Sequence, residues 1–457
     1  MLAAGIANAA PQATPSALPE TLAEAIRGVR TRRISPLELT RATLAQIERL
    51  NPRLNAFVTV LAEQALAAAR RPAAVGLLHG IPIAVKDLFD TAGVRTTAAS
   101  AQWAERVPRE DAAVVTRLRR AGAILVGKCN LDEFAYNFTS STSHFGLIRN
   151  PWNTACTPGG SSGGSAVAVA AGMCTATLGS DTGGSIRLPA ALCGVTGFKP
   201  SYGAVSTQGG APLAWSMDHT GPLARTAEDV AILFGVLRDT PAGAVPPLRR
   251  VRVGVARTYF AGIETDVSRA VEAALGELGK LTAGPPPDAS LPALEPFPSL
   301  PVLPRDYGVL VLSEAHAFHL EMLRAAPGKY HADTRRSIEG GAAFTVPEYV
   351  RARQALERHR AGARRELFAS VDLLALPTAP GVAFPFERPA DLIFLRNTAP
   401  WNLYGCPAIS LPCGFSRDGL PVGLQLVGAP GADDLVLAAA QAYQRATDWH
   451  RRRPPLG

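Results

Sequence analysis

The amino-acid sequence predicts an α/β fold in which helices cover both faces of a central sheet. Short, almost wholly apolar runs, typical of buried strands, alternate along the chain with segments that repeat apolar residues at helical spacing. The chain has 457 residues, of which 47% are hydrophobic and 18% are charged, so it can bury a large core. Length alone would allow two or three domains.

The composition limits the classes of partner and cofactor. The formal net charge of +8 comes from arginines spread along the chain, without a long basic block, so we expect no nucleic-acid binding. No run of eighteen apolar residues occurs, so we expect no membrane span and a cytoplasmic protein. The six cysteines have neither CxxC nor His-paired spacing, which argues against zinc and against a disulfide framework. We expect small buried thiols, no metal and no cofactor.

The N-terminal part of the chain predicts a lead-in followed by helices. Residues 1–20 lack the basic start and long apolar core of a secretory signal, and we expect a poorly ordered segment, with a trimmed signal as the alternative. Residues 21–70 predict a helical entry region. A first helix begins near Thr21, and the second has Ser35 as its cap and Pro36 in its first turn. We expect the second helix to end at residues 51–52 and a third to span about residues 61–69.

Residues 77–240 are the expected catalytic core. The apolar run at residues 77–87 predicts a buried strand that carries Lys86 and Asp87 to an edge of the sheet. The later expected strands are at residues 123–129, 174–178, 251–255, 373–376, 408–412 and 422–427. The later expected helices are at residues 112–121, 186–192, 227–237, 267–278, 347–368 and 435–446. The Pro-rich residues 284–304 are expected to be a surface connection.

One of these strands also resembles a phosphate-binding loop. Gly122, Gly127 and Lys128 have the spacing of that motif, but Cys129 stands where Ser or Thr would bind magnesium. The residues between the glycines are Ala-Ile-Leu-Val, which is typical of a strand. We therefore expect no nucleotide site here.

Two Gly/Ser clusters, at residues 159–164 and 183–185, mark the expected reactive site. A flexible linker would not place an apolar run between such clusters, whereas dense glycines let backbone N–H groups approach a ligand. Ser162 fits the G-x-S-x-G elbow of α/β-hydrolases, but no strand precedes it. Ser185 follows a predicted strand and precedes a predicted helix, and the N–H groups of Thr182, Gly183 and Gly184 could surround an oxyanion there.

A serine nucleophile needs a base, and Lys86 is the best candidate. Burial lowers the pKa of a lysine and leaves a neutral amine that can accept a proton. Among the histidines near the clusters, His79, His144 and His219 have no sequence setting that marks a base. The alternative for Lys86 is a buried ion pair with Asp87 or Asp90.

At this point the chain closely resembles the amidase signature family of serine hydrolases, which includes aryl acylamidases and urethanases. The matching segments are GIPIAVKD (80–87), GGSSGGSA (159–166), GSDTGGSIRLPA (179–190), GFKP (197–200), PAISLPCG (407–414) and GLPVGLQ (419–425). The resemblance covers nearly the whole chain. It implies a single α/β/α domain over residues 21–457, built on a mixed, mostly parallel sheet.

The resemblance also implies a Ser–Ser–Lys triad. Carried over by position, Ser185 is the nucleophile, Ser161 the bridging serine after a cis peptide bond, and Lys86 the base. Asp181 and Arg187 are expected to form an ion pair that braces the turn at Ser185.

One branch of the family, the A subunit of glutamine-dependent tRNA amidotransferases, is the second reading. Such subunits carry an acidic residue five positions before the proline of a P-x-N-L-x-G-x-P segment, where it anchors the amino group of glutamine. Here that segment is PWNLYGCP (400–407), and the corresponding position is Leu395, which puts glutamine specificity in doubt. A reading from another class, an inactive binding protein, would require loss of Lys86, Ser161 or Ser185, and all three are present.

The expected substrate is a small uncharged amide, anilide or carbamate. Segments that correspond to the family's pocket are rich in aromatic residues and poor in charge, and an ionic group would lack a partner there. The expected pocket residues are Phe134, Tyr136, Phe138, Trp215, Trp401 and Tyr404. Several of them could instead belong to the core. We expect a monomer or a homodimer.

Overall fold

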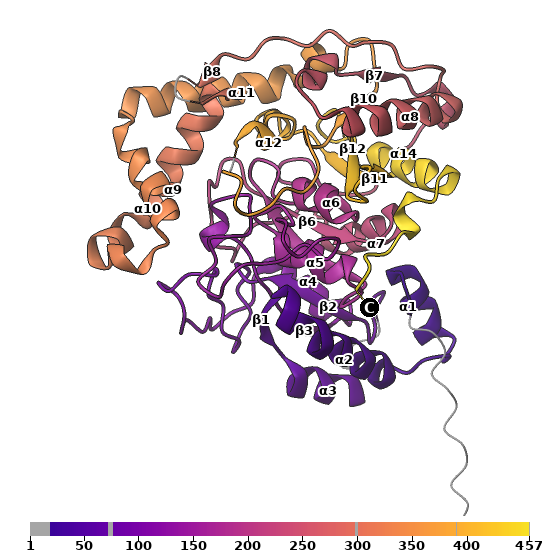
Figure 1. The fold of residues 1–457 in the computed structure, drawn as a ribbon, viewed down its shortest axis with the longest axis vertical. Coiled ribbons are helices and arrows are strands. Elements are labelled where there is room, and N and C mark those ends of the chain that lie inside the picture. Colours follow the sequence, from indigo (N-terminus) through magenta and orange to yellow (C-terminus); the bar gives the residue numbers. More distant parts are fainter. Residues whose placement is uncertain (1–18, 72–75, 298–299, 390, 457) are drawn as a thin grey trace, which may run out of the picture.

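A computed structural model describes residues 19–71, 76–297, 300–389 and 391–456. Except for Pro19 and Glu20, the expected lead-in at residues 1–20 lies outside the described residues. Ten strands form one sheet in the order β1-β3-β2-β4-β6-β5-β11-β12-β10-β7, with helices on either side (Figure 1). The strands of this sheet are β1 (Phe57–Val60), β2 (Pro82–Lys86), β3 (Ile124–Cys129), β4 (Ala176–Asp181), β5 (Thr196–Lys199), β6 (His219–Ala224), β7 (Val253–Val255), β10 (Leu373–Pro377), β11 (Ala408–Phe415) and β12 (Pro421–Gly428).

The sheet is mixed, as expected, but the prediction that it is mostly parallel is wrong. Among the nine strand pairings of this sheet in the described residues, β2–β3, β2–β4 and β7–β10 are parallel and six are antiparallel. Part of the error lies in β5 and β6, which the sequence pattern did not predict. Gly221 and Pro222 interrupt the strand pattern of β6, although Pro222 pairs with Leu178 of β4.

Helices cover both faces of the sheet, as the sequence predicts. The helices are α1 (Leu22–Arg30), α2 (Pro36–Leu54), α3 (Ala62–Arg70), α4 (Ala113–Arg120), α5 (Gly163–Ala170), α6 (Arg187–Cys193), α7 (Ala227–Leu237), α8 (Thr265–Leu281), α9 (Arg305–Ala325), α10 (Ala332–Gly340), α11 (Val346–Leu367), α12 (Ile393–Arg396), α13 (Ala399–Leu403) and α14 (Asp433–Ala446). Thr21 and Ser35 both form capping boxes at the starts of α1 and α2. No helix among the described residues is both long enough and apolar enough to cross a bilayer.

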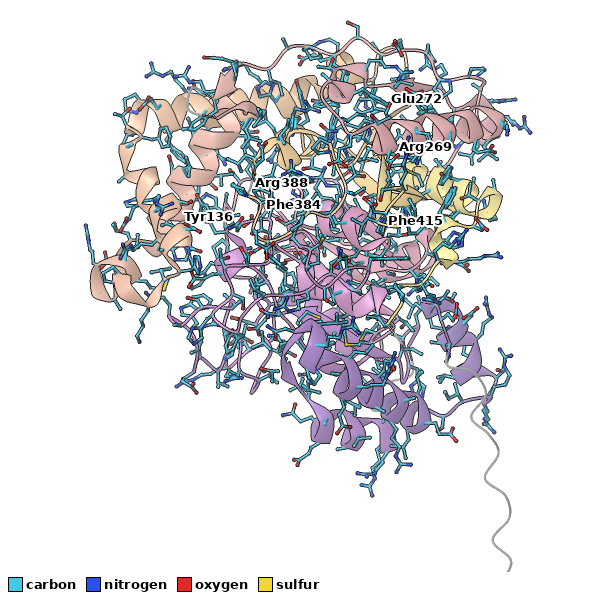
Figure 2. All side chains as sticks on the ribbon, viewed as in Figure 1. Tyr136, Arg269, Glu272, Phe384, Arg388 and Phe415 are labelled. Carbon is cyan, nitrogen blue, oxygen red and sulfur yellow. The ribbon has the colours of Figure 1, made fainter. Side chains whose placement is uncertain are left out.

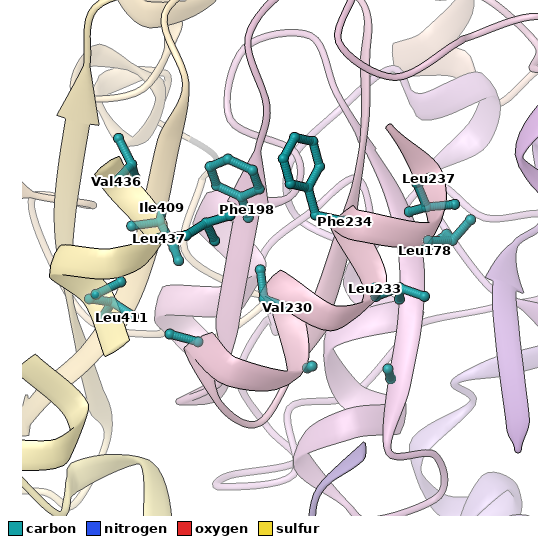
Figure 3. Close-up of a cluster of buried hydrophobic side chains, with 14 of the residues drawn as sticks. Leu178, Phe198, Val230, Leu233, Phe234, Leu237, Ile409, Leu411, Val436 and Leu437 are labelled. Carbon is teal, nitrogen blue, oxygen red and sulfur yellow. The ribbon is translucent and has the colours of Figure 1, made fainter. Parts of the chain in front are cut away.

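The two faces of the sheet belong to separate hydrophobic clusters. Along β2, Ile83 and Val85 join a cluster with α4, α7, α8 and α14, whereas Ala84 joins a cluster with α2, α3 and α5. This follows from the alternation of side chains along a strand. Figure 3 shows part of the first cluster, in which Phe198 of β5 meets Phe234 of α7 edge to face at 5.2 Å between ring centroids. Helices therefore pack against the sheet on both of its faces.

The chain between β7 and β10 departs from the expectation. Residues 284–295 are largely exposed, but the Pro-rich stretch ends in a two-stranded ribbon of β8 (Pro296–Phe297) and β9 (Leu300–Pro304) with Phe297 and Leu303 buried. The ribbon leads into α9 and α10, which the sequence pattern did not predict and which lie together at one side of the molecule (Figure 1). The Pro-rich stretch is therefore only in part a surface connection.

Candidate active site

Lys86 is the last residue of β2 and is completely buried. Its Nζ lies within hydrogen-bond distance of three hydroxyl oxygens: Ser161 Oγ at 2.7 Å, Ser162 Oγ at 2.9 Å and Ser180 Oγ at 2.9 Å. The parallel pairing of β2 with β4 explains part of this arrangement, because it brings the carboxyl ends of both strands to the same edge. Every residue of β2 is apolar except Lys86, so the strand anchors the amine in the core.

The alternative expectation of an ion pair between Lys86 and a neighbouring aspartate is wrong. Asp87 faces Lys128, with 3.5 Å between Oδ1 and Nζ, and Asp90 pairs with Arg106 at 2.6 Å. Lys128 also donates to the carbonyl oxygen of Phe89 and thus has a structural role inside β3. The segment that resembles a phosphate loop is therefore a strand, as predicted.

Burial lowers the pKa of Lys86 to about 7, although the carboxylates of Asp132, Asp181 and Asp218 act in the opposite direction. A substantial fraction of this amine is therefore neutral near neutral pH and can accept a proton. His219, by contrast, is an unsuitable base. Burial lowers its pKa well below the usual range, and its Nδ1 lies 2.7 Å from the carbonyl oxygen of Met217.

The first Gly/Ser cluster forms the loop before α5 and the first two residues of that helix. The peptide bond between Gly160 and Ser161 is cis, as the family resemblance implies. The Asp132 carboxylate packs against this loop, and a Cβ on Gly160 would lie 2.2 Å from its Oδ2. Asp132 also accepts hydrogen bonds from the N–H groups of Ser140 and Ser141, so it ties a neighbouring loop to the cluster.

The second cluster is the turn between β4 and α6. Ser185 is 6% exposed, and its carbonyl oxygen accepts a hydrogen bond from the N–H of Ser162, so the two clusters are in direct contact. Gly184 adopts a φ of +138°, and a Cβ there would lie 2.3 Å from Thr398 Oγ1. Only glycine fits this backbone, which holds Ser185 at the edge of a cavity.

A buried ion pair braces the turn, as predicted. Arg187 binds the Asp181 carboxylate with two hydrogen bonds, from Nε at 2.9 Å and from Nη2 at 2.8 Å. Asp181 Oδ1 also accepts the N–H of Gly184 at 2.8 Å. This bond removes Gly184 from the three expected oxyanion donors and leaves Thr182 and Gly183.

Two further residues complete the ion-pair network, although nothing in the sequence pattern had singled them out. Arg187 donates to Asn402 Oδ1 at 2.6 Å and to Gln425 Oε1 at 2.8 Å. Both residues stand in segments that carry the family resemblance, and that position was the available signal. Their amide oxygens, together with the carbonyl oxygen of Thr398 at 2.9 Å, satisfy the three remaining donors of a buried guanidinium.

An apolar cavity of about 180 Å³ adjoins Ser185. Its wall includes Tyr136, Phe138, Tyr307 and Leu395, and no Asp, Glu, Lys or Arg belongs to it among the described residues. Tyr136 lies on the side of the molecule where α9 and α10 pack (Figure 2). The site can therefore take an uncharged group next to the Ser185 hydroxyl.

The structure brings two of the six expected pocket aromatics, Tyr136 and Phe138, to this cavity. Trp215 is 45% exposed and lines a second cavity of about 50 Å³. The remaining three, Phe134, Trp401 and Tyr404, are buried side chains outside the described wall of the Ser185 cavity, which corrects the expectation for them.

These three residues pack in the core for identifiable reasons. Phe134 meets Trp103 edge to face at 5.0 Å, Trp401 donates from its indole nitrogen to Asn397 O at 2.8 Å, and Tyr404 packs on His359. Several other wall residues come from the ribbon, α9 and α10, where no local motif marked them. These residues include Phe297, Leu303, Tyr307, Val311 and Ser337.

Among the described residues, no group of three or more His, Cys, Asp and Glu side chains could hold a metal ion. All six cysteines are buried and free, as expected.

The chain is similar to known proteins over most of its length. The family model described as "Amidase" matches residues 38–437. The A subunit of the glutamyl-tRNA(Gln) amidotransferase of Roseiflexus sp. (strain RS-1) is 41% identical, over 95% of this chain and 98% of the relative. A crystal structure of an amidase is similar with a TM-score of 0.84 and 36% identity, over 93% of this chain and 99% of the other. A structure of 6-aminohexanoate cyclic dimer hydrolase is similar with a TM-score of 0.85 and 28% identity, over 95% and 98%. The chain therefore belongs to the amidase signature family of hydrolases, which act on carbon–nitrogen bonds.

Proposed function

We propose that the chain hydrolyses an amide through an acyl-enzyme, with Ser185 as nucleophile, Ser161 as bridging residue and Lys86 as base. The observation that carries this proposal is the 2.7 Å distance between Lys86 Nζ and Ser161 Oγ, in a loop that also contacts Ser185. A lysine that is neutral near pH 7 can start a proton relay through a hydroxyl group.

The relay moves two protons in each half of the reaction. Neutral Lys86 takes the proton of Ser161 while Ser161 takes that of Ser185, and the Ser185 Oγ forms a bond to the carbonyl carbon. The protons then return through Ser161 to the nitrogen of the leaving group as the C–N bond breaks. Water attacks the acyl-enzyme by the same relay and releases a carboxylic acid.

The carbonyl oxygen becomes negative in the tetrahedral intermediate and needs donors. The N–H groups of Thr182 and Gly183, in the turn before Ser185, are the proposed oxyanion hole. A Cβ on Gly183 would lie 2.0 Å from the Tyr307 hydroxyl oxygen, so this backbone stands directly against the wall of the cavity. A substrate carbonyl beside Ser185 would therefore lie close to these donors.

The cavity supports an uncharged acyl group as the substrate side of the amide. Leu395 belongs to the cavity wall, at the position where the glutamine-specific branch carries an acidic residue. A charged amino group would therefore be desolvated there without a partner. Similarity to a hydrolase named for the 6-aminohexanoate cyclic dimer supports the same reading. Alkyl amides and anilides are the first class to test, with aryl carbamates as a further class.

The second candidate is the glutaminase subunit of a tRNA-dependent amidotransferase. Sequence similarity favours it over the first candidate, because relatives that share about 40% of their residues with this chain are named as the A subunit of glutamyl-tRNA(Gln) amidotransferase. The cavity wall favours the amide hydrolase instead, because Leu395 stands where the glutamine-specific branch carries an acidic residue. An inactive binding protein is disfavoured, because Lys86 contacts the first Gly/Ser cluster and that cluster contacts the second.

A substrate panel separates these candidates. We expect turnover of a nitroanilide with an apolar acyl group, weaker turnover of an aryl carbamate, and little turnover of glutamine by the chain alone. Dominant glutamine turnover, stimulated by amidotransferase partner subunits, would establish the second candidate. A fluorophosphonate probe tests the shared chemistry, and absence of labelling at Ser185 would support the binding protein.

A further inference from the structure

The proposed relay uses one of the three hydroxyl groups that Lys86 contacts and leaves Ser180 without a role. We propose that Ser180 is a positioning residue, which directs the lone pair of neutral Lys86 toward Ser161. This inference rests on the proposed function, since it concerns the group named there as the base. Ser180 lies in β4, next to β2 in the sheet, and its Oγ is 2.9 Å from Lys86 Nζ.

The hydrogen atoms of the amine limit what it can do. A neutral lysine amine has two N–H bonds and one lone pair, whereas three hydroxyl oxygens lie within 2.9 Å of this nitrogen. The lone pair can accept the proton of Ser161 only if both N–H bonds point elsewhere. Ser162 and Ser180 supply the two acceptors, so together they select the productive rotamer of the amine.

Ser162 is held in its acceptor role by the backbone. Its hydroxyl donates to the carbonyl oxygen of Ser180 at 3.1 Å and accepts the N–H of Ser180 at 3.3 Å. Its own proton is thus used, and only a lone pair remains for Lys86. The N–H bond of Lys86 that points at Ser162 is therefore fixed. The orientation of the amine then depends on the second acceptor, the Ser180 hydroxyl oxygen.

Ser180 differs from Ser162 in its surroundings. Among the described residues, the only hydrogen-bond partner of its Oγ is Lys86 Nζ, and the residue lines the cavity of about 50 Å³ together with Thr182 and Asp218. The hydroxyl proton can therefore turn into this cavity while the oxygen accepts the second N–H bond. Loss of this oxygen would let the amine rotate and offer an N–H bond to Ser161 in place of the lone pair.

The charged groups around Lys86 do not set its orientation. Asp132, Asp181 and Asp218 face the amine but are engaged elsewhere: Asp132 with the N–H of Ser140, Asp181 with Arg187, and Asp218 with the hydroxyl of Thr182. The adjacent Asp87 faces Lys128. None of these carboxylates is a hydrogen-bond partner of Lys86 Nζ, so the serine hydroxyl groups set the orientation of the amine.

The test compares the pH dependence of kcat/KM in Ser180→Ala, Ser180→Thr and a matched control. The control is Thr177→Val, which removes a buried hydroxyl three residues earlier in β4 whose bond goes to the carbonyl oxygen of Ser165. For Ser180→Ala we expect the alkaline plateau to fall about 10- to 100-fold, part of the roughly 10²- to 10⁴-fold that general base catalysis provides. The acidic limb of the kcat/KM profile should move by about half a unit to lower pH. The reason is that the charged form of Lys86 loses a stronger hydrogen bond to Ser180 than the neutral amine does, so the amine deprotonates more readily.

Ser180→Thr keeps the hydroxyl and should restore most of the plateau, and Thr177→Val should leave the acidic limb where it is. Thermal melting of each variant identifies any that fails to fold. If Ser180→Ala fails to fold, the kcat/KM profile of Ser180→Thr is compared with that of the wild type instead. A Ser180→Ala profile that matches Thr177→Val in plateau and limb would overturn the inference. An active Lys86→Met variant would overturn the proposed function itself, which distinguishes the two failures.

Discussion

Lys86 Nζ lies 2.7 Å from Ser161 Oγ, although 75 residues separate them in the chain. The contact exists because β2 delivers the lysine from the core to the sheet edge, where the loop before α5 crosses it. An amine held in this way can act only through a hydroxyl group, and the following predictions test that constraint.

Replacement of Ser185 should abolish turnover. For Ser185→Ala we expect kcat to fall by about 10⁴-fold or more, because the relay members act as one unit and the attacking oxygen is lost. Lys86→Ala should be nearly as damaging, and Ser161→Ala severe but less complete. Steady-state kinetics and mass spectrometry of the fluorophosphonate adduct measure this. Ser162→Ala is the comparison for labelling only: it keeps Ser185 and should still form the adduct, although its turnover should fall because Ser162 orients Lys86. Loss of labelling there with retention in Ser185→Ala would favour the elbow serine.

The rate should increase with pH through the pKa of the buried lysine. Since burial lowers the pKa of Lys86 to about 7, kcat/KM should rise with unit slope below that pH and level off above it. A profile recorded from pH 5 to 10 with a neutral anilide measures this. A midpoint near 10 would show that the amine keeps the pKa of an exposed lysine.

Lys86 should cost the protein stability in a pH-dependent manner. Its folded pKa is lower than the unfolded value, so the unfolded chain binds more protons between about pH 7 and 10.5, and stability rises with pH in that window. Relative to Lys86→Met, the wild type should gain a few kcal/mol over the window, at about 1.4 kcal/mol per unit of pKa difference. Urea unfolding of both proteins at pH 7 and pH 10 measures this, and a constant difference would contradict it.

Breaking the ion pair that braces the turn at Ser185 should destabilise the fold. Burial opposes the charge on Asp181, yet the Arg187 guanidinium holds the pKa of this carboxyl well below its usual range. Asp181→Asn would leave a buried guanidinium without its partner, and we expect a loss of about 3–5 kcal/mol in the free energy of unfolding.

The matched control for that variant is Asp90→Asn, which breaks the partly exposed pair with Arg106. It should cost no more than about 1 kcal/mol, because water screens the charges. Equal losses in the two variants would show that the Asp181 pair has no special role.

Leu395 should govern the choice between apolar and amino-acid substrates. Leu395→Asp places a carboxylate in the cavity wall, and kcat/KM for an apolar anilide should fall about 10-fold or more, because the charge must be desolvated when the substrate binds. Glutamine turnover should rise in the same variant, and Leu395→Asn is the uncharged control. No change in the ratio of the two activities would place selectivity elsewhere.

The contact between Lys86 and the two Gly/Ser clusters could be predicted from the sequence because it depends on short segments with strict requirements. An apolar strand that ends in Lys86 and a strand-to-turn transition at Ser185 are visible locally, and the motifs fix Ser161 between them. The relative direction of neighbouring strands was harder to predict. Gly221 and Pro222 interrupt the strand pattern of β6, and its antiparallel pairing with β4 is not visible in the periodicity of the sequence.

The cavity beside Ser185 could not be predicted in the same way. Its wall combines side chains from distant parts of the chain, and an aromatic residue in a pocket segment has no local mark that separates it from a core residue. Trp401 shows this, because it stands in a family motif but is 1% exposed and bonded to Asn397. Tyr307, which does line the cavity, belongs to a helix without any motif.

The excursion between β7 and β10 leaves the sheet and returns to it at adjacent parallel strands of one edge. Lys86, Ser161 and Ser185 all precede that excursion, yet Phe297, Tyr307 and Ser337 within it form part of the cavity wall. The proposed relay and this part of the cavity wall thus lie in separate stretches of the chain, whereas Tyr136, Phe138 and Leu395 of the same wall lie outside the excursion. Substitutions within the excursion could therefore reshape one side of the cavity while Lys86, Ser161 and Ser185 stay unchanged.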